Sequence, residues 1–350
     1  MDHPELADPL LRLSLADKIG QVLSVAWGRH GALALTSGSR VDTHDEIQQV
    51  VIDLGIGGVC YFPSKPEGDT EAEVAAGLAE LQRLAVERTG IGLLTSTDQE
   101  GGRVARLRRG YTAVPSAREL GSDPGRVREY ALVSGTELAR TGINMVFAPV
   151  ADVDSNPDNP VIADRSFSAD PDQVARCVTA AIEGYHQAGI TCVAKHFPGH
   201  GDTNVDSHQD QPSIDRSLEG WRRLEAVPFR AAVEAGVDAI MLGHLVFPAL
   251  DDQMATVSAG LVDLVRGELG FDGLLVTDAL EMQGATKGRD PGQLVVDSLA
   301  AGIDQLLIPA DNRVAHAALV AAVEDGRLSR QRVDDACRRV LAVKARTTPA

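Results

Sequence analysis

One short pattern recurs seven times along the chain and constrains its fold more than any other feature. In each copy, a segment with helical periodicity ends in glycine, and an apolar, often β-branched run begins directly after it. Glycine adopts the left-handed conformation that ends many helices, and a short run without polar alternation is typical of a strand buried on both faces. Each copy therefore predicts a helix-to-strand turn, at Gly55, Gly90, Gly142, Gly189, Gly236, Gly270 and Gly302.

An eighth apolar run, residues 19–27, precedes these turns, and the stretches between the runs have the periodicity of helices. Residues 71–89, for example, carry one apolar stripe made by Val74, Leu78, Leu81 and Ala85. Eight β-loop-α units at a mean spacing of roughly 40 residues predict an α/β protein with a closed (β/α)8 barrel of the TIM type. The alternative is an open doubly wound sheet, which usually carries a glycine-rich phosphate-binding turn that this sequence lacks.

The chain has the sequence features of one domain. With 350 residues and 44% hydrophobic content, it can bury a large core. No Pro/Ser-rich linker or low-complexity block divides it. We therefore expect residues 1–350 to form a single domain with its core at about 14–345, closed by a last helix at 330–346.

The charge balance argues against two classes of partner. Asp and Glu number 50 against 33 Lys and Arg, which gives a formal net charge of −17. Such a charge repels nucleic acid and anionic membranes, so we expect neither as a partner. Residues 1–20 have acids where a signal peptide needs bases and contain no long apolar run, which predicts a soluble, cytoplasmic protein. We expect it to be a monomer.

The cysteines and histidines suggest no metal centre. The four cysteines are widely spaced, without a C-x-x-C pair, which predicts reduced structural thiols. His196, His200 and His208 with Asp202 could be read as a metal cluster. However, the segment between the first two histidines contains Pro and Gly, so a helix cannot align them as ligands. We therefore expect no metal ion and no cofactor.

Polar side chains directly follow several of the predicted strands. In a barrel of this kind, chemistry collects at the C-terminal ends of the strands, because the βα loops meet there. The residues at these positions are Asp98, Lys195, His196, His244 and Asp278. The loop after the fourth strand is unusually long and holds Arg165, and long loops on a rigid barrel are commonly functional. Asp278 could also simply cap the following helix.

The loop after the fifth predicted strand, residues 195–212, reads KHFPGHGDTNVDSHQDQP and is rich in titratable groups. Asp206 lies two residues before His208, close enough to orient the imidazole and raise its basicity. A proton-transfer pair is one interpretation, and a solvated polar loop is the other. In the basic run after DQEGG, Arg106 lies near the predicted mouth, whereas Arg108 and Arg109 are expected on a solvated face.

Four motifs together resemble family 3 glycoside hydrolases, specifically their β-N-acetylglucosaminidase branch. They are KHFPGHGDTNVDSH, DQEGGRVAR, DRSFSADP and LGFDGLLVTDALEM, and the resemblance runs from about residue 14 to residue 345. It implies a barrel of the (β/α)8 type. It also implies a retaining exo-β-N-acetylglucosaminidase that removes terminal β-linked GlcNAc from muropeptides or chitin fragments through a covalent glycosyl-enzyme intermediate.

The resemblance also assigns roles to individual residues. Asp278 would be the nucleophile, and His208, assisted by Asp206, the general acid/base. The terminal sugar would be held by Asp98, Arg106, Arg165, Lys195 and His196. These types suit the reaction, because retaining hydrolysis needs an attacking carboxylate and a proton donor that later acts as a base, and an imidazole can serve in both steps.

The sequence departs from the branch in places and leaves rival functions open. Ala279 stands where the branch often has a second acid, and residues 28–46 form a longer segment than expected, which affects the leaving-group side of the substrate. An imidazole does not repel phosphate, so a β-N-acetylglucosaminide phosphorylase is the main alternative. A β-glucosidase, a metal-dependent hydrolase and a non-catalytic sugar-binding protein are weaker ones.

Overall fold

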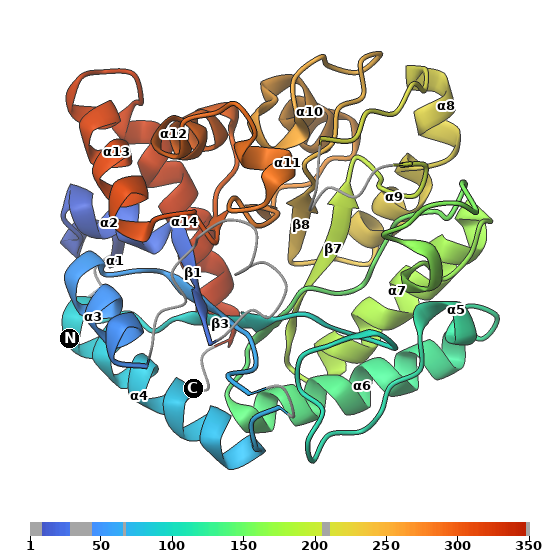
Figure 1. The fold of residues 1–350 in the computed structure, drawn as a ribbon, viewed down its shortest axis with the longest axis horizontal. Helices are drawn as coiled ribbons and strands as arrows, with labels where there is room; N and C mark the ends of the chain where they lie inside the picture. The colour runs from blue at the N-terminus through green and yellow to red at the C-terminus, as the bar shows by residue number, and fades with distance from the viewer. Residues whose placement is uncertain (1–8, 29–43, 66–67, 205–210, 348–350) are drawn as a thin grey trace, which may run out of the picture.

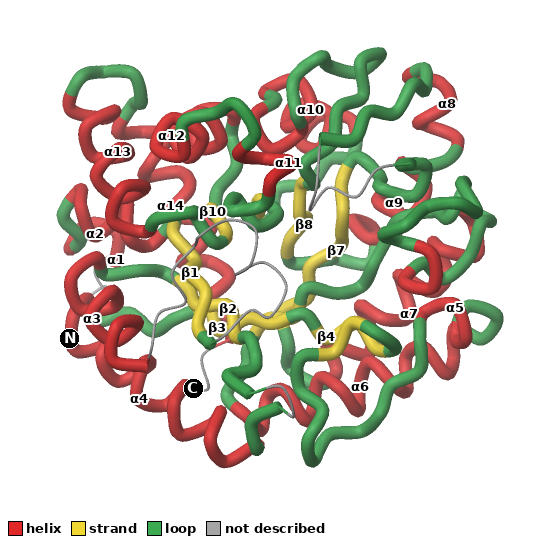
Figure 2. Tube along the Cα trace, in the orientation of Figure 1, coloured by secondary structure: helices red, strands yellow, loops and turns green. Residues whose placement is uncertain are grey.

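The computed structural model describes residues 9–28, 44–65, 68–204 and 211–347. At its centre, eight parallel strands lie in the order β10-β1-β2-β3-β6-β7-β8-β9 (Figures 1 and 2). Pairing of Val276 with Gln305 joins the last strand to the first and closes the ring. The predicted (β/α)8 barrel is confirmed. Its strands are β1 (Leu23–Trp27), β2 (Gly58–Tyr61), β3 (Leu94–Thr97), β6 (Met145–Val146), β7 (Thr191–Phe197), β8 (Ala239–Leu242), β9 (Leu274–Thr277) and β10 (Leu306–Leu307).

Helices surround the ring of strands, as the red outer tube around the yellow centre of Figure 2 shows. The longer ones are α2 (Leu15–Gln21), α3 (His44–Leu54), α4 (Glu71–Thr89), α6 (Pro124–Thr141), α7 (Pro171–Gln187), α9 (Ala226–Glu234), α12 (Pro291–Ala301), α13 (Asn312–Glu324) and α14 (Arg330–Thr347). Shorter helical turns are α1 (Pro9–Arg12), α5 (Ala117–Leu120), η1 (Ala163–Arg165), α8 (Leu218–Arg223), η2 (Ala255–Val257), α10 (Ala259–Asp263), η3 (Leu264–Glu268) and α11 (Gln283–Thr286).

The glycine pattern has the structural meaning that the sequence predicts. All seven glycines have a positive φ, from 60° at Gly55 to 113° at Gly302, and each lies between a helix and the strand that follows. One boundary differs from the prediction, because residues 19–21 end helix α2 and β1 begins only at Leu23. Ser14 caps this helix by accepting the backbone N–H of Asp17. A short apolar run cannot by itself distinguish a buried helix end from a strand.

The apolar core lies in two shells. Side chains such as Val193 and Met241 fill the interior of the barrel, whereas Cys192 and Ala194 face the helices outside it. This alternation is the normal result of a strand pleat with both faces buried. All four cysteines are buried free thiols, as predicted. Among the described residues, we find no helix with the length and apolar character needed to cross a membrane.

A two-stranded hairpin that the sequence analysis did not predict follows β3. It pairs β4 (Gln99–Gly101) with β5 (Val104–Ala105) in antiparallel fashion. The side chain of Gln99 holds the returning chain, because its Oε1 accepts the backbone N–H groups of Arg106 and Leu107 at 2.9 and 3.0 Å. The hairpin thereby brings Arg106 back beside Asp98, whose carbonyl oxygen accepts the Arg106 N–H at 3.2 Å.

Candidate active site

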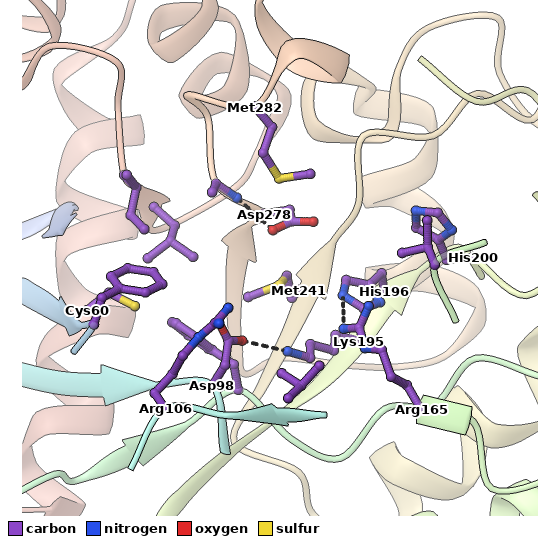
Figure 3. A pocket seen from close by; sticks show the side chains of 17 residues that line it. Cys60, Asp98, Arg106, Arg165, Lys195, His196, His200, Met241, Asp278 and Met282 are labelled. Carbon is purple, nitrogen blue, oxygen red and sulfur yellow. Dashed lines mark hydrogen bonds and ion pairs between the residues drawn. The ribbon is translucent and has the colours of Figure 1, made fainter. Parts of the chain in front are cut away.

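A pocket opens at the C-terminal ends of the strands, where the sequence predicts that functional side chains meet (Figure 3). Six of the eight predicted site residues line it, although they come from four separate segments of the chain. They are Asp98, Arg106, Arg165, Lys195, His196 and Asp278. The other two, Asp206 and His208, lie outside the described residues, so their pairing stays a prediction.

Five charged side chains of alternating sign form a row at this pocket; Arg106, Asp98, Lys195 and Arg165 line it, and Glu100 pairs with two of them. Lys195 Nζ donates to Asp98 Oδ1 at 2.8 Å and lies 2.7 Å from Glu100 Oε1. Arg165 holds Glu100 through two hydrogen bonds of 2.8 and 2.7 Å, which is the strong bidentate arrangement. At the other end, Arg106 Nη2 lies 3.2 Å from Asp98 Oδ2. The row contains three cations and two anions, so its net charge is positive.

Neighbouring charges keep the members of this row ionised. Burial alone would raise the pKa of Asp98, but the charges of Lys195 and Arg106 outweigh burial and hold this pKa far below its usual range. Burial opposes ionisation of Glu100 too, yet Arg165 and Lys195 lower its pKa to about 2. For Lys195 and Arg165, the same carboxylates overcome burial and raise the pKa. The pocket therefore offers charged donors and acceptors suited to hydroxyl groups.

His196 is held in one orientation by a buried carboxylate. Its Nδ1 lies 2.7 Å from Asp152 Oδ2, and the other oxygen of Asp152 accepts the backbone N–H of His200 at 2.6 Å. Burial would raise the pKa of Asp152, but the charge and hydrogen bond of His196 lower it. Because Asp152 stays ionised, Nδ1 donates this bond, and Nε2 points toward Arg165, whose Nη2 is 3.5 Å away.

Lys195 and His196 both line the pocket, although consecutive residues of a regular strand face opposite sides. The pairing of β7 with β8 shifts register between Ala194 and Phe197. Such an irregularity re-aims side chains and is often found beside active sites. This irregularity explains how two adjacent side chains can both line the pocket.

Asp278 follows β9 and lies in Figure 3 beside Met282 and Met241, away from the row of charges around Lys195. Its Oδ1 accepts the backbone N–H of Ala279 at 2.7 Å. The capping alternative is wrong, because the next helix, α11, begins after Met282, and Met282 makes no side-chain capping bond. The Asp278 carboxylate is thus positioned at the pocket rather than at a helix end.

His244, also predicted at the rim, does not line the pocket. It is fully buried, and its Nε2 lies 2.8 Å from the carbonyl oxygen of Ala279, while Nδ1 lies 3.1 Å from Thr256 Oγ1. It therefore supports the turn that carries Asp278. Arg108 and Arg109 are exposed, as expected.

Sequence reasoning missed two carboxylates and the apolar wall of the site. Glu100 stands inside the DQEGG motif, and Asp152 lies six residues after the end of β6 but only two after the apolar run that ends at Val150. The rule that picks residues at strand ends could have found Asp152. Nothing in the sequence marked the pocket's apolar lining, which includes Phe62, Phe147, Met241 and Met282.

The described members of the possible metal cluster, His196, His200 and Asp202, have other partners. His200 Nδ1 lies 2.8 Å from Thr203 Oγ1, and burial lowers the pKa of His200 to about 4. Asp202 forms an ion pair with Arg216. Within the described ranges, no group of three metal-ligand side chains is found at this pocket.

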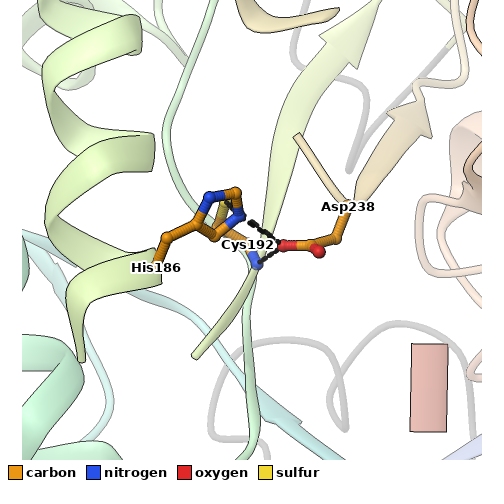
Figure 4. Close-up of side chains that lie close together, drawn as sticks. All are labelled: His186, Cys192 and Asp238. Atoms are coloured by element: carbon orange, nitrogen blue, oxygen red, sulfur yellow. Dashed lines mark hydrogen bonds and ion pairs between the residues drawn. The ribbon is translucent and has the colours of Figure 1, made fainter. Parts of the chain in front are cut away.

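One cluster of metal-ligand residue types lies elsewhere, at the opposite ends of the strands (Figure 4). His186 Nε2 is 2.9 Å from Asp238 Oδ2, and the Cys192 backbone N–H donates to the same oxygen at 3.0 Å. Arg346 Nη1 lies 3.1 Å from Asp238 Oδ1. Because the carboxylate already has these partners, the cluster is explained as a contact that fastens the end of α7 to the start of β7.

Comparison with known proteins gives a consistent result. The family described as "Glycosyl hydrolase family 3 N terminal domain" matches residues 14–343. A protein of Idiomarina loihiensis named Beta-hexosaminidase is 40% identical over 243 residues, which cover 67% of this chain and 73% of the relative. A Pseudomonas aeruginosa protein of the same name is 35% identical over 296 residues, covering 83% and 86% of the two chains.

Solved structures agree with the sequence matches. A family 3 beta-N-acetylglucosaminidase from Paenibacillus sp. str. FPU-7 superimposes with a TM-score of 0.89 at 40% identity. The match covers 97% of this chain, which spans 64% of the length of that protein. A Beta-N-acetylhexosaminidase from Beutenbergia cavernae has a TM-score of 0.84 at 33% identity, with 95% and 99% of the two chains covered.

Proposed function

The chain belongs to glycosyl hydrolase family 3, and we propose that it is a retaining exo-β-N-acetylglucosaminidase that removes terminal β-linked GlcNAc. One observation carries this proposal. The Asp278 carboxylate and a row of ionised hydrogen-bonding groups line the same pocket at the mouth of the barrel. The hexosaminidase names of the relatives supply the sugar.

Asp278 would attack the anomeric carbon and form a covalent glycosyl-enzyme. Such a nucleophile must be ionised at the pH of the reaction, and Asp278 shares its pocket with the side chains of Lys195 and Arg165. The apolar neighbours Met241 and Met282 exclude water from one side of Asp278.

The row of charges would hold the hydroxyl groups of the terminal sugar. Asp98 offers acceptors, Lys195 and Arg106 offer donors, and Asp152 fixes the His196 ring that lies beside Arg165. Hydrogen bonds to charged groups contribute about 1.5–3 kcal/mol each when made in a site of this kind. Their fixed positions bind one sugar in one orientation, which is what exo cleavage requires.

We propose that His208, assisted by Asp206, protonates the leaving oxygen and then activates water. The support is the resemblance of residues 195–208 to the family motif and the presence of Lys195, His196 and His200 in the pocket lining. An imidazole titrates near neutrality, so it can donate a proton in the first step and accept one in the second.

The natural substrate that we propose is a GlcNAc-containing muropeptide, with a chitin fragment as the other possibility. We also propose one catalytic domain over residues 1–350 that works as a monomer in the cytoplasm. In the described part of the chain, the large exposed apolar side chains, such as Leu11 and Val133, are scattered along the sequence. The four buried free thiols suit a reducing compartment. Size-exclusion chromatography with light scattering tests the monomer.

Product analysis with and without phosphate tests the function. The enzyme is incubated with an aryl β-GlcNAc and, separately, with the matching aryl β-glucoside. We expect free GlcNAc at a rate that phosphate does not change, and little cleavage of the glucoside. Release of GlcNAc-1-phosphate would identify a phosphorylase instead, and preference for the glucoside would overturn the sugar assignment.

A further inference from the structure

We infer that Arg216 is a positioning residue that holds together the two ends of the loop on which the proposed acid/base residues lie; this inference rests on the proposed function. We call residues 198–202 the first stem, residues 213–216 the second stem, and the ion pairs of Arg216 that join them the clip. Arg216 Nη2 lies 2.6 Å from Asp202 Oδ2, and its Nε lies 2.6 Å from Glu225 Oε1. Asp202 precedes Asp206 by four residues, and Arg216 follows His208 by eight. The ion pair therefore joins the chain just before and just after the segment 203–215.

The first stem is held firmly against its surroundings as far as Asp202. The buried Trp221 donates its indole N–H to the carbonyl oxygen of Pro198 at 2.9 Å, and Asn159 Nδ2 donates to the carbonyl oxygen of His200 at 2.8 Å. Gly199 packs so closely on Glu225 that an added Cβ would lie 2.5 Å from its Cγ. The backbone from residue 198 to residue 200 is thus fixed to neighbouring elements.

The second stem is fixed to the barrel just before Arg216. Ile214 N donates to the carbonyl oxygen of Val246 at 2.9 Å, and Ser213 pairs with the same residue. Arg216 is three-quarters buried and lies between a carboxyl group on each side, that of Asp202 on the first stem and that of Glu225 at the start of α9. Closing a loop at its base reduces the number of conformations open to the residues within it.

Glu225 gives the clip a rigid anchor inside the protein. Its side chain is 2% exposed, whereas that of Asp202 is 34% exposed. Burial raises the pKa of the Glu225 carboxyl to about 7, against the opposing effect of Arg216, and the charge of Asp202 adds to the rise. The ion pair between Glu225 and Arg216 therefore strengthens as the pH rises through neutrality, because the Glu225 carboxyl group loses its proton.

The inference predicts a kinetic signature that general loss of stability does not produce. General acid catalysis contributes about 10²–10⁴-fold, and it matters most for a leaving group that cannot depart without a proton. If the clip positions the acid/base, its loss reduces kcat/KM, which reports the step that expels the leaving group, much more for a poor leaving group than for an activated aryl glycoside. Loss of sugar binding would instead lower kcat/KM equally for both, and the groups that bind the sugar are held by other contacts.

The experiment compares Arg216→Met and Arg216→Lys with the full-length wild type on two substrates. One is a nitrophenyl β-GlcNAc, and the other is the disaccharide GlcNAc-β-1,4-GlcNAc. We expect Arg216→Met to lose at least about 10-fold more kcat/KM on the disaccharide than on the aryl glycoside. Arg216→Lys keeps the charge but cannot reach both carboxyl groups in the same way, so we expect it to recover only part of the difference. The control is Arg222→Met, which removes a surface ion pair with Glu268 in the neighbouring helix and is expected to change neither substrate's kinetics.

Two further variants keep the test decisive if Arg216→Met does not fold. Asp202→Asn leaves the buried Glu225 pair in place and is expected to show the same substrate dependence, less strongly. His208→Ala provides the reference pattern of a missing acid/base. Equal losses on both substrates for Arg216→Met or Asp202→Asn overturn the inference while leaving the proposed function standing. A wild type that cleaves neither substrate overturns the proposed function itself.

Discussion

The two ends of the barrel both bury networks of opposite charges, but they use them differently. At the mouth, the chain of ion pairs around Lys195 lines a pocket, so its hydrogen-bonding groups can be shared with a ligand. At the opposite end, the fully buried Asp304 is enclosed by Arg266, Arg332 and Arg339 at 2.7, 2.7 and 3.3 Å. The same ion-pair chemistry therefore makes a binding site only where the packing leaves room.

Two buried lysines show the same contrast. Lys195, at the mouth, lies against two carboxylates, and its pKa is raised. Lys344, at the other end, donates to the neutral amide oxygen of Gln21 at 2.6 Å, and burial lowers its pKa to about 7. A buried lysine keeps its charge where neighbouring carboxylates stabilise the ammonium group. Of these two lysines, the one that keeps its charge is Lys195, at the end of the barrel where a ligand would bind.

Removal of the proposed nucleophile is expected to have the largest effect on activity. Asp278→Ala should reduce kcat/KM for an aryl β-GlcNAc by about 10,000-fold or more, because the covalent step has no other nucleophile. The melting temperature should change little, since the carboxylate lines the pocket and does not form part of the apolar core. Near-normal turnover by the variant would contradict the assignment.

At the opposite end of the barrel, the expected effect falls on stability instead. Asp304→Ala leaves three arginines without their shared buried anion, and breaking such a network by removing one partner destabilises by about 3–5 kcal/mol. Denaturant unfolding measures this loss. We expect the fraction that stays folded to retain the wild-type kcat, and a specific loss of kcat would contradict the division of roles between the two ends.

Lys344 is expected to make stability depend on pH. Its pKa is about 7 in the folded state against 10.5 in the unfolded chain, so the unfolded chain holds more protons between these values. The free energy of unfolding should therefore gain a contribution that grows from pH 7 to about pH 10. Below pH 7, both states are protonated, and the full penalty for burying the ammonium remains. Lys344→Met should remove this pH dependence; parallel pH profiles for variant and wild type would show that the lysine is not the cause.

The smallest expected effects concern metal ions and the cluster of His186, Cys192 and Asp238. EDTA should leave activity unchanged, because the chemistry assigned to the mouth uses only side chains. Cys192→Ser should also leave kcat unchanged and shift the free energy of unfolding by about 1 kcal/mol or less, since only the thiol is altered. Loss of activity that added Zn²⁺ restores would contradict both expectations.

Much of the fold followed from local sequence signals. Glycines such as Gly90 and Gly142 predicted helix ends because their left-handed backbone is a local property. The hairpin of β4 and β5 escaped prediction, because strands of two or three residues have no period to detect. The end of α2 was interpreted as a strand for a related reason, since a short apolar run occurs both in buried helix ends and in buried strands.

The sequence could identify the site residues that stand at strand ends. It could not identify those whose role depends on contacts with residues far away in the sequence. Asp98, Lys195 and Asp278 could be placed at one rim by counting strands. Glu100 could not, because its importance comes from contacts with Lys195 and Arg165, which are distant in sequence. A buried ion pair between distant segments leaves no local pattern to read.

Trapping of the covalent intermediate tests the central claim most directly. A fluorinated GlcNAc donor with a good leaving group slows hydrolysis of the glycosyl-enzyme, and digestion followed by mass spectrometry locates the sugar. We expect one added sugar on the peptide that contains Asp278, and no label on the Asp278→Ala variant. A label on another carboxylate, or turnover without any covalent adduct, would contradict the account.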